Sequence, residues 1–199
     1  GGGFMKYIWR LREWPHFQWN NDELLEVLGA ARYSQGALLA KVQALGIHNK
    51  PEAYAEVLIE ETLKTAEIEG EKYNKDSVRS SVAKHLGLST VGLPTNTKNI
   101  DGLVEVLLDA TENFNKALTL SRLQSWHAAL FPTGYSGLSK IKVARWRGKE
   151  PMRVVSGPIG KERIHFEAPP YDRVSNEMKT FLSWWKKSEG SVDGIIRAA

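Results

Sequence analysis

The segment PEAYAEVLIEETLKTAEIEG, residues 51–70, has the apolar spacing of a helix that packs against other helices. Pro51 suits the first turn of such a helix, where its missing N–H is not needed. At about 100° per residue, the charged side chains fall together in one arc of about 80°. They are Glu56, Glu60, Lys64 and Glu67. The segment therefore predicts a helix with a narrow solvated stripe, in a fold that is mainly α.

The same helical spacing places one carboxylate, that of Glu69, among apolar neighbours. It falls beside Leu58 and Thr62, on the side expected to pack. Desolvating an unpaired carboxylate costs several kcal/mol, so a buried one needs a partner. Two interpretations stay open: the last turn frays and turns Glu69 to water, or a cation meets it. Arginine would suit best, because its planar guanidinium binds a carboxylate through two hydrogen bonds.

The composition is that of an ordinary globular protein. The 199 residues are 42% hydrophobic and 25% charged, with 27 basic and 23 acidic side chains. A formal charge of +4 is too small to indicate nucleic-acid binding, and no apolar run approaches the length of a membrane span. The absence of cysteine excludes disulfides and fits a reducing compartment. We therefore expect a cytoplasmic protein that binds no membrane and no nucleic acid.

Further amphipathic segments predict more helices along the chain. They cover residues 21–28 (capped by Asn21 or Asp22), 34–45, 77–86, 100–114, 118–131 (capped by Thr119 or Ser121), a helix that begins at Ser175, and a last one capped by Ser191. The turn-rich stretch GLPTNTKN, residues 92–99, is a candidate domain boundary. It would separate a helical N-terminal domain, residues 5–92, from a second domain, residues 98–199. Residues 1–4 precede Met5 and are interpreted as an addition to the natural chain.

The stretch MRVVSGPIGKERIHF, residues 152–166, differs from the rest of the chain. Val154 and Val155 lead into SGPIGKE, and Ile164 and Phe166 follow it. Two short β-prone runs around a glycine-rich turn predict a β-hairpin inside a helical protein. From the residues alone, this hairpin could equally be an ordinary surface feature.

Two other features of the sequence are candidate sites. His127 shares a helix face with Leu123, Trp126 and Leu130 and has no second ligand at metal spacing, so a packing role is expected. A basic run could attract phosphates or acidic targets, or could simply be solvated. It consists of Lys140, Lys142, Arg145, Arg147 and Lys149. No phosphate-binding loop of the Gly-x-x-x-x-Gly-Lys-[Ser/Thr] type is present.

Several of these stretches together resemble the Fic family. TAEIEG, residues 65–70, matches the [Ser/Thr]-x-x-x-Glu-[Gly/Asn] motif of Fic proteins whose inhibitory helix precedes the Fic core. The other stretches that carry the resemblance, in the family's order, are WPHFQW (14–19), LTLSRLQSWHAALFP (118–132), RWRG (145–148), MRVVSGPIGKERIHFEAPP (152–170) and EMKTFLSWW (177–185). The resemblance implies a Fic-type helical fold with one β-hairpin flap, preceded by a helical N-terminal domain.

Fic enzymes transfer AMP from ATP to a hydroxyl of a target protein, with Mg²⁺ on the phosphates. Their signature loop, His-Pro-Phe-x-[Asp/Glu]-Gly-Asn-Gly-Arg, has no counterpart here. The resemblance therefore implies that residues 98–199 are the front part of a Fic core, cut shortly before that loop. We expect no catalytic residue and no metal ligand in this chain, no bound ATP or Mg²⁺, and no activity without the remainder.

The resemblance assigns roles to two sets of residues. Thr65, Glu69 and Gly70 would form the inhibitory motif, in which Glu69 holds the last arginine of the signature loop and blocks the ATP γ-phosphate. Here Glu69 should be unpaired, and Gly70 should end its helix. The flap that takes the target as an added strand would comprise Met152, Val154, Val155, Ile164, His165 and Phe166.

The target would present a Ser, Thr or Tyr hydroxyl. Apolar surface left exposed by the missing helices of the core would also allow a homo-oligomer. Whether AMP is also removed stays open. The alternative, from another functional class, is a non-enzymatic helical binding or regulatory module for a partner protein or nucleic acid.

Overall fold

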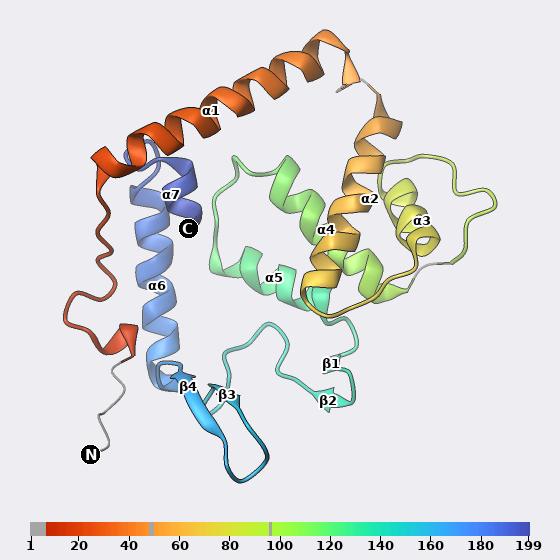
Figure 1. The fold of residues 1–199 in the computed structure, drawn as a ribbon. Coiled ribbons are helices and arrows are strands. Elements are labelled where there is room, and N and C mark those ends of the chain that lie inside the picture. Colours follow the sequence, from red (N-terminus) through yellow and green to blue (C-terminus); the bar gives the residue numbers. More distant parts are fainter. Residues whose placement is uncertain (1–6, 48–49, 96) are drawn as a thin grey trace. The chain divides into compact units, whose positions relative to one another are not determined.

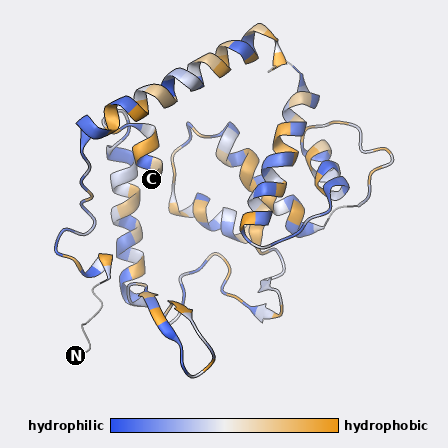
Figure 2. Cartoon of the chain, in the orientation of Figure 1, coloured by the Kyte–Doolittle hydropathy of each residue, from blue (hydrophilic) through white to orange (hydrophobic). Residues whose placement is uncertain are grey.

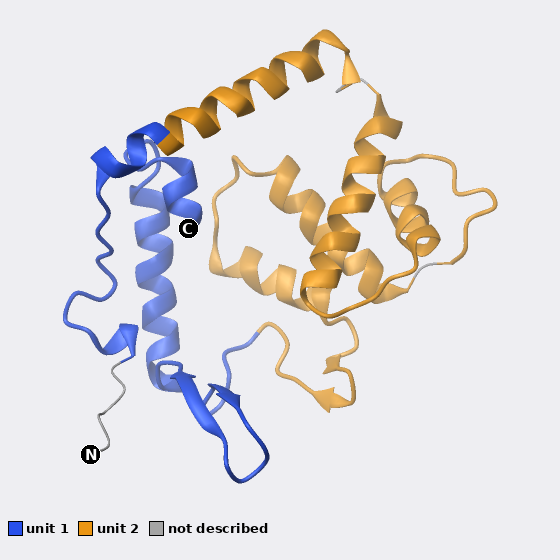
Figure 3. Cartoon of the chain, in the orientation of Figure 1, with its two compact units in different colours: residues 1–26, 145–199 blue, residues 27–144 orange. Residues whose placement is uncertain are grey.

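A computed structural model describes residues 7–47, 50–95 and 97–199 (Figure 1). The described part is mainly helical, as predicted, and it divides into two compact units. One unit joins residues 1–26 to residues 145–199, and the other comprises residues 27–144 (Figure 3). The interpretation of residues 1–4 as an addition lies outside the described residues. The predicted division into residues 5–92 and 98–199 stays a prediction.

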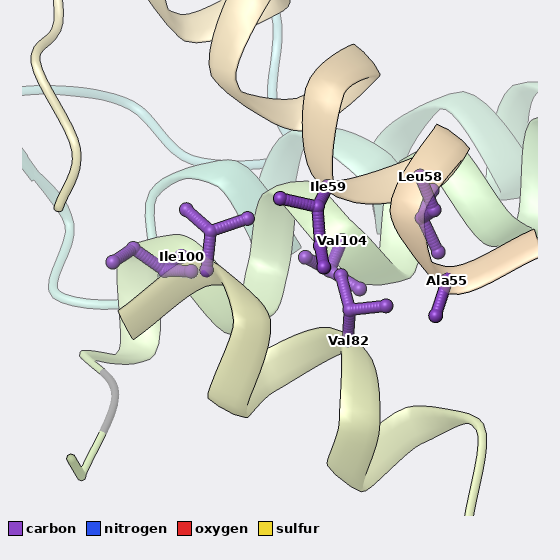
Figure 4. Close-up of a cluster of buried hydrophobic side chains, with 7 residues drawn as sticks. Ala55, Leu58, Ile59, Val82, Ile100 and Val104 are labelled. Atoms are coloured by element: carbon purple, nitrogen blue, oxygen red, sulfur yellow. The ribbon is translucent and has the colours of Figure 1, made fainter. Parts of the chain in front are cut away.

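Three helices form the core of the unit of residues 27–144. They are α2 (Pro51–Ile68), α3 (Lys75–His85) and α4 (Lys98–Glu112). Their buried side chains make one cluster, which contains Ala55, Leu58, Ile59, Val78, Val82, Ile100 and Val104 (Figure 4). Because Leu58 and Ile59 supply two of these side chains, the helical spacing of residues 51–70 identified the packed side of α2 correctly.

Helix α5 (Leu120–Leu130) packs closely on α4 at Gly102. A Cβ atom built on Gly102 would lie 1.8 Å from the carbonyl oxygen of Ala129, so only a glycine fits. The N-termini of α4 and α5 are capped by threonine hydroxyls. Thr97 accepts a hydrogen bond from the N–H of Ile100, and Thr119 accepts one from the N–H of Arg122. Of the two residues predicted to cap α5, Thr119 is therefore confirmed.

One continuous helix, α1 (Asn21–Ala44), covers the region for which two separate helices, residues 21–28 and 34–45, were predicted, so that prediction is wrong. Residues 29–33 between them contain no proline, and Gly29 is tolerated inside the helix at a cost of about 1 kcal/mol. None of its described residues is buried, and apolar and polar residues are mixed along its length (Figure 2). The division between the two units falls within α1, after Glu26.

The other unit is built around a hairpin and a helix. Strands β3 (Arg153–Ser156) and β4 (Arg163–Glu167) pair antiparallel, which confirms the predicted hairpin, and α6 (Tyr171–Lys187) follows. The short 3₁₀ helix η1 (Ile8–Arg10) contributes Trp9, which is 6% exposed. The Trp9 indole N–H donates to the carbonyl of Glu167 at 2.6 Å, so the N-terminal segment is held against β4.

Two helix starts differ from the sequence prediction. Helix α6 begins at Tyr171 rather than at Ser175, with Pro170 at its N-cap position. Because proline has no N–H to donate to the preceding β3–β4 hairpin, the strand ends before it and the helix starts directly after it. The final short helix α7 (Gly194–Ala198) is capped by Asp193 rather than Ser191. The Ser191 hydroxyl is engaged elsewhere, since it donates to the carbonyl of Ser188 at 3.1 Å.

A second, smaller hairpin was not predicted. Strands β1 (Tyr135–Ser136) and β2 (Ser139–Lys140) have only two residues each and turn through Gly137, whose φ is +57°. Such short strands have too few residues to show alternation. Among the described helices, none combines the length and the apolar character that a membrane crossing needs.

Candidate functional site

The C-terminus of α2 carries the predicted inhibitory motif, and Gly70 ends the helix there as predicted. Gly70 has φ +80°, a left-handed conformation that glycine adopts without penalty. Its N–H donates to the carbonyl of Glu67 at 3.0 Å, and the N–H of Glu71 donates to Ala66 at 2.9 Å. This pair of bonds is the Schellman arrangement, which satisfies the last carbonyls of the helix and turns the chain away from it.

Glu69 occupies the C-cap of α2 and is exposed to solvent. The expectation that it lies on the packed side of the helix is therefore wrong. The last turn of α2 extends past the side chains that cover the core, as the neighbouring Ile68, 82% exposed, also shows. Of the two interpretations of the sequence, the structure agrees with the one that turns the carboxylate to water.

The Glu69 carboxylate makes no hydrogen bond or ion pair with any residue that the structure describes. Two nearby lysines hold other carboxylates instead. Lys64 contacts Glu67 at 2.8 Å, and Lys75 contacts Glu60 at 2.7 Å. These contacts lower the pKa values of Glu67 and Glu60, while Glu69 keeps its carboxylate free for another group. Thr65 is half-buried and contributes its carbonyl, which accepts from the N–H of Glu69 at 3.3 Å.

The predicted flap has a fully exposed strand. All four residues of β3 are exposed, and the apolar side chains of Met152, Val154 and Val155 are 61%, 55% and 48% accessible. Val154 pairs with Phe166 and Val155 with Ile164. His165 is therefore the extra residue of a β-bulge, which twists the hairpin locally.

The two edges of this hairpin differ. The edge of β4 is covered, since Trp9 bonds the carbonyl of Glu167 and Tyr7 packs edge-on against Phe166, with ring centroids 5.6 Å apart. The N–H of Ala168 donates to the carbonyl of Met152 at 2.9 Å, so the backbone carbonyl of Met152 points toward β4. Because backbone groups alternate along an antiparallel strand, those of the next residue, Arg153, point to the outer edge of β3.

One predicted flap residue has a local partner. The Nε2 atom of His165 lies 2.6 Å from the hydroxyl of Ser156 across the hairpin, and both side chains are exposed. The structure thus gathers the six predicted flap residues on one hairpin. The inhibitory motif belongs to the unit of residues 27–144 and the flap to the other unit.

His127 has the packing role that its helix face predicted. Its Nδ1 accepts a hydrogen bond from the N–H of Ala144 at 3.0 Å, and its ring contacts Phe131 with centroids 5.0 Å apart. This bond steadies Ala144, which has a φ of +52°. Among the described residues, no three His, Asp or Glu side chains come together in a way that could hold a metal ion.

A polar cluster around Asp109 was missed by sequence reasoning. The Asp109 carboxylate accepts hydrogen bonds from Arg122 Nε, Trp126 Nε1 and Asn113 Nδ2, each at 2.7 Å. Arg122 also stacks on the Trp126 ring, 5.0 Å from its centroid, and donates to the carbonyl of Lys116 at 3.0 Å. The only sequence signal for this cluster is the four-residue spacing of Arg122 and Trp126, which places both on one helix face. The cluster joins α4 to α5 and is structural.

The comparisons with known proteins reach the N-terminal part of the chain. Residues 7–88 match a family model described as "Domain of unknown function (DUF4172)". This range includes Thr65, Glu69 and Gly70 and ends before the hairpin. No curated protein matches the chain. An uncharacterised domain is thus identified over residues 7–88.

Proposed function

We propose that this chain is the N-terminal part of a self-inhibited protein adenylyltransferase of the Fic type. The observation that carries the proposal is the position of Glu69. A carboxylate projects from a helix end that Gly70 terminates cleanly, and it has no partner among the described residues. Such a group suits the role of holding a guanidinium that would otherwise bind a phosphate.

The proposed reaction transfers AMP to a target hydroxyl. The hydroxyl oxygen bonds to the α-phosphorus of ATP, the bond to pyrophosphate breaks, and a base takes the hydroxyl proton. In this proposal, the loop that the resemblance places after Ala199 would hold Mg²⁺ and supply the base. The proposed role of this chain is to restrain the reaction through Glu69 and to position the target.

Target positioning is proposed for the hairpin. The outer edge of β3 offers the unpaired backbone groups that an added strand requires, and Val154 and Val155 supply exposed apolar contacts. The covered edge of β4 leaves β3 as the side on which a target segment would add.

The test replaces Glu69 in the protein made from the complete reading frame. Glu69→Gly should increase incorporation of AMP from labelled ATP, because the arginine it holds becomes free to bind phosphate. Glu71→Gly is the matched control, since Glu71 is an exposed carboxylate two residues further on that lies outside the motif. Equal labelling by the wild-type protein and Glu69→Gly would exclude the inhibitory role.

A second candidate function has its own observation. Lys140 and Lys142 are exposed and make no ion pair with a described residue, as a binding module for an acidic partner would require. A steep loss of nucleic-acid binding with salt would favour this module. ATP-dependent labelling of a target protein would exclude it as the main function.

A further inference from the structure

Basic side chains gather on the hairpin and on the segment that leads into it. Residues 145–165 contain six basic side chains and two acidic ones. The basic ones are Arg145, Arg147, Lys149, Arg153, Lys161 and Arg163, and the acidic ones are Glu150 and Glu162. All 21 positions belong to the same compact unit.

Two of the six cations already have partners. The Arg147 guanidinium donates to the carbonyl of Pro169, and Arg153 Nε contacts Glu167 at 2.7 Å. These contacts hold the leading segment and the base of the hairpin in place. Neither side chain is available to a ligand without loss of a contact.

The other four cations are exposed and free. Arg145, Lys149, Lys161 and Arg163 make no ion pair with any residue in the described part of the chain. Glu162 makes no ion pair with them, since its carboxylate accepts from the N–H of Gly160 at 2.8 Å, and six basic against two acidic side chains leave residues 145–165 with a net charge of +4. The hairpin and the segment that leads into it therefore carry net positive charge, and β3 of the same hairpin has an open edge.

The surrounding side chains decide which kind of polyanion fits. The exposed apolar groups of the hairpin are aliphatic: Val154, Val155 and Ile159 are 55%, 48% and 99% accessible. Single-stranded nucleic acid is held by stacking on several aromatic rings, whereas the described strands of this hairpin expose only the His165 imidazole, and the half-buried Phe166 ring contacts Tyr7. An open strand edge with aliphatic contacts instead suits a polypeptide.

We propose that the hairpin selects a hydroxyl-bearing polypeptide segment flanked by aspartate or glutamate. The segment adds to β3 through its backbone, and its carboxylates meet Arg145, Lys149, Lys161 and Arg163. The identification of this segment as the AMP acceptor rests on the proposed function. The preference for acidic flanks does not, because it follows from the free cations and the open edge.

The test measures binding of fluorescent peptides to the 199-residue chain by anisotropy. One peptide carries a serine flanked by glutamates, and its counterpart has glutamine at the same places. The acidic peptide should bind at least about tenfold more tightly, as four weak exposed ion pairs together allow. Replacing the four free cations by glutamine should abolish the difference.

A matched variant controls for net charge. It replaces four exposed lysines elsewhere by glutamine: Lys50, Lys72, Lys116 and Lys179. This variant should keep the preference for the acidic peptide. Equal binding of both peptides, equal loss in both variants, or tighter binding of a single-stranded RNA than of the acidic peptide would each overturn the inference.

The outcomes also separate this inference from the proposed enzyme. Selective binding of the acidic peptide, without AMP transfer by the protein from the complete reading frame, keeps the inference and removes the enzyme. AMP transfer that ignores the charges around the acceptor hydroxyl overturns the inference and keeps the enzyme.

Discussion

At the scale of single residues, Asp109 links pH to stability. Its three side-chain hydrogen bonds, that from Arg122 foremost, lower its pKa from 3.8 to about 2. The folded state therefore favours the carboxylate more than the unfolded chain does. The resulting stabilisation is present above the unfolded pKa near 4 and is lost as the pH falls through the folded value of about 2.

Asp109→Asn should accordingly lower the stability of the protein at neutral pH, and this loss of stability should be smaller at acidic pH. We expect urea unfolding midpoints of variant and wild type to differ at about pH 6 and to converge toward about pH 2. Glu112→Gln, an exposed carboxylate on the same helix, is the control and should change neither midpoint. A difference that stays constant with pH would show that the Asp109 charge does not matter.

Gly70 provides a second prediction at this scale. Gly70→Ala should destabilise the protein by about 1 kcal/mol, because alanine at φ +80° meets a steric cost that glycine avoids. Gly70→Asn should cost less, since asparagine tolerates the left-handed conformation. Thermal unfolding measures both. Equal melting temperatures for wild type and Gly70→Ala would contradict the helix-terminating role of this glycine.

At the scale of elements, the contact between α4 and α5 depends on the absence of a side chain. Gly102→Ala places a methyl group against the backbone oxygen of Ala129, which cannot move without moving α5. We expect a loss of about 3 kcal/mol in unfolding free energy. Gly36→Ala is the matched control: apart from its chain neighbours and the backbone of its own helical turns, no atom lies within 4 Å of its Cβ position, so helix propensity should stabilise it by up to about 1 kcal/mol. Similar effects of the two changes would refute the close packing of α4 and α5.

The hairpin is tested by separating target labelling from nucleotide binding. Val154→Pro or Ile164→Ala, in the protein from the complete reading frame, should reduce AMP transfer to the target, because both alter the hairpin to which the target would add. ATP binding, measured by calorimetry, should persist. Parallel loss of labelling and ATP binding would indicate that the hairpin has only a structural role.

Elements with a strong local signal could be predicted from the sequence. Helix α2 and the pair β3–β4 follow from short-range spacing, and Gly70 from its preference for positive φ. Features set by distant contacts could not. The exposure of Glu69 depends on where the neighbouring helices stop covering α2. Helical spacing in the sequence carries no information about that position.

At the scale of the whole molecule, the compact units do not follow chain order. Residues 1–26 join residues 145–199, and the bond from Trp9 to Glu167 spans 158 positions. No local sequence pattern indicates such a contact, so the sequence could not predict it. The Asp109 cluster escaped prediction for the same reason, since its partner Arg122 lies 13 residues away on another helix.

The enzymatic account depends on a partner for Glu69 that none of the described residues provides. The most direct measurement is to sequence the source gene downstream of codon 199. The account predicts that the reading frame continues into a His-Pro-Phe loop that ends in arginine, which would supply the guanidinium for Glu69. A stop codon directly after Ala199 would contradict it, and a binding or regulatory module would then explain the chain better.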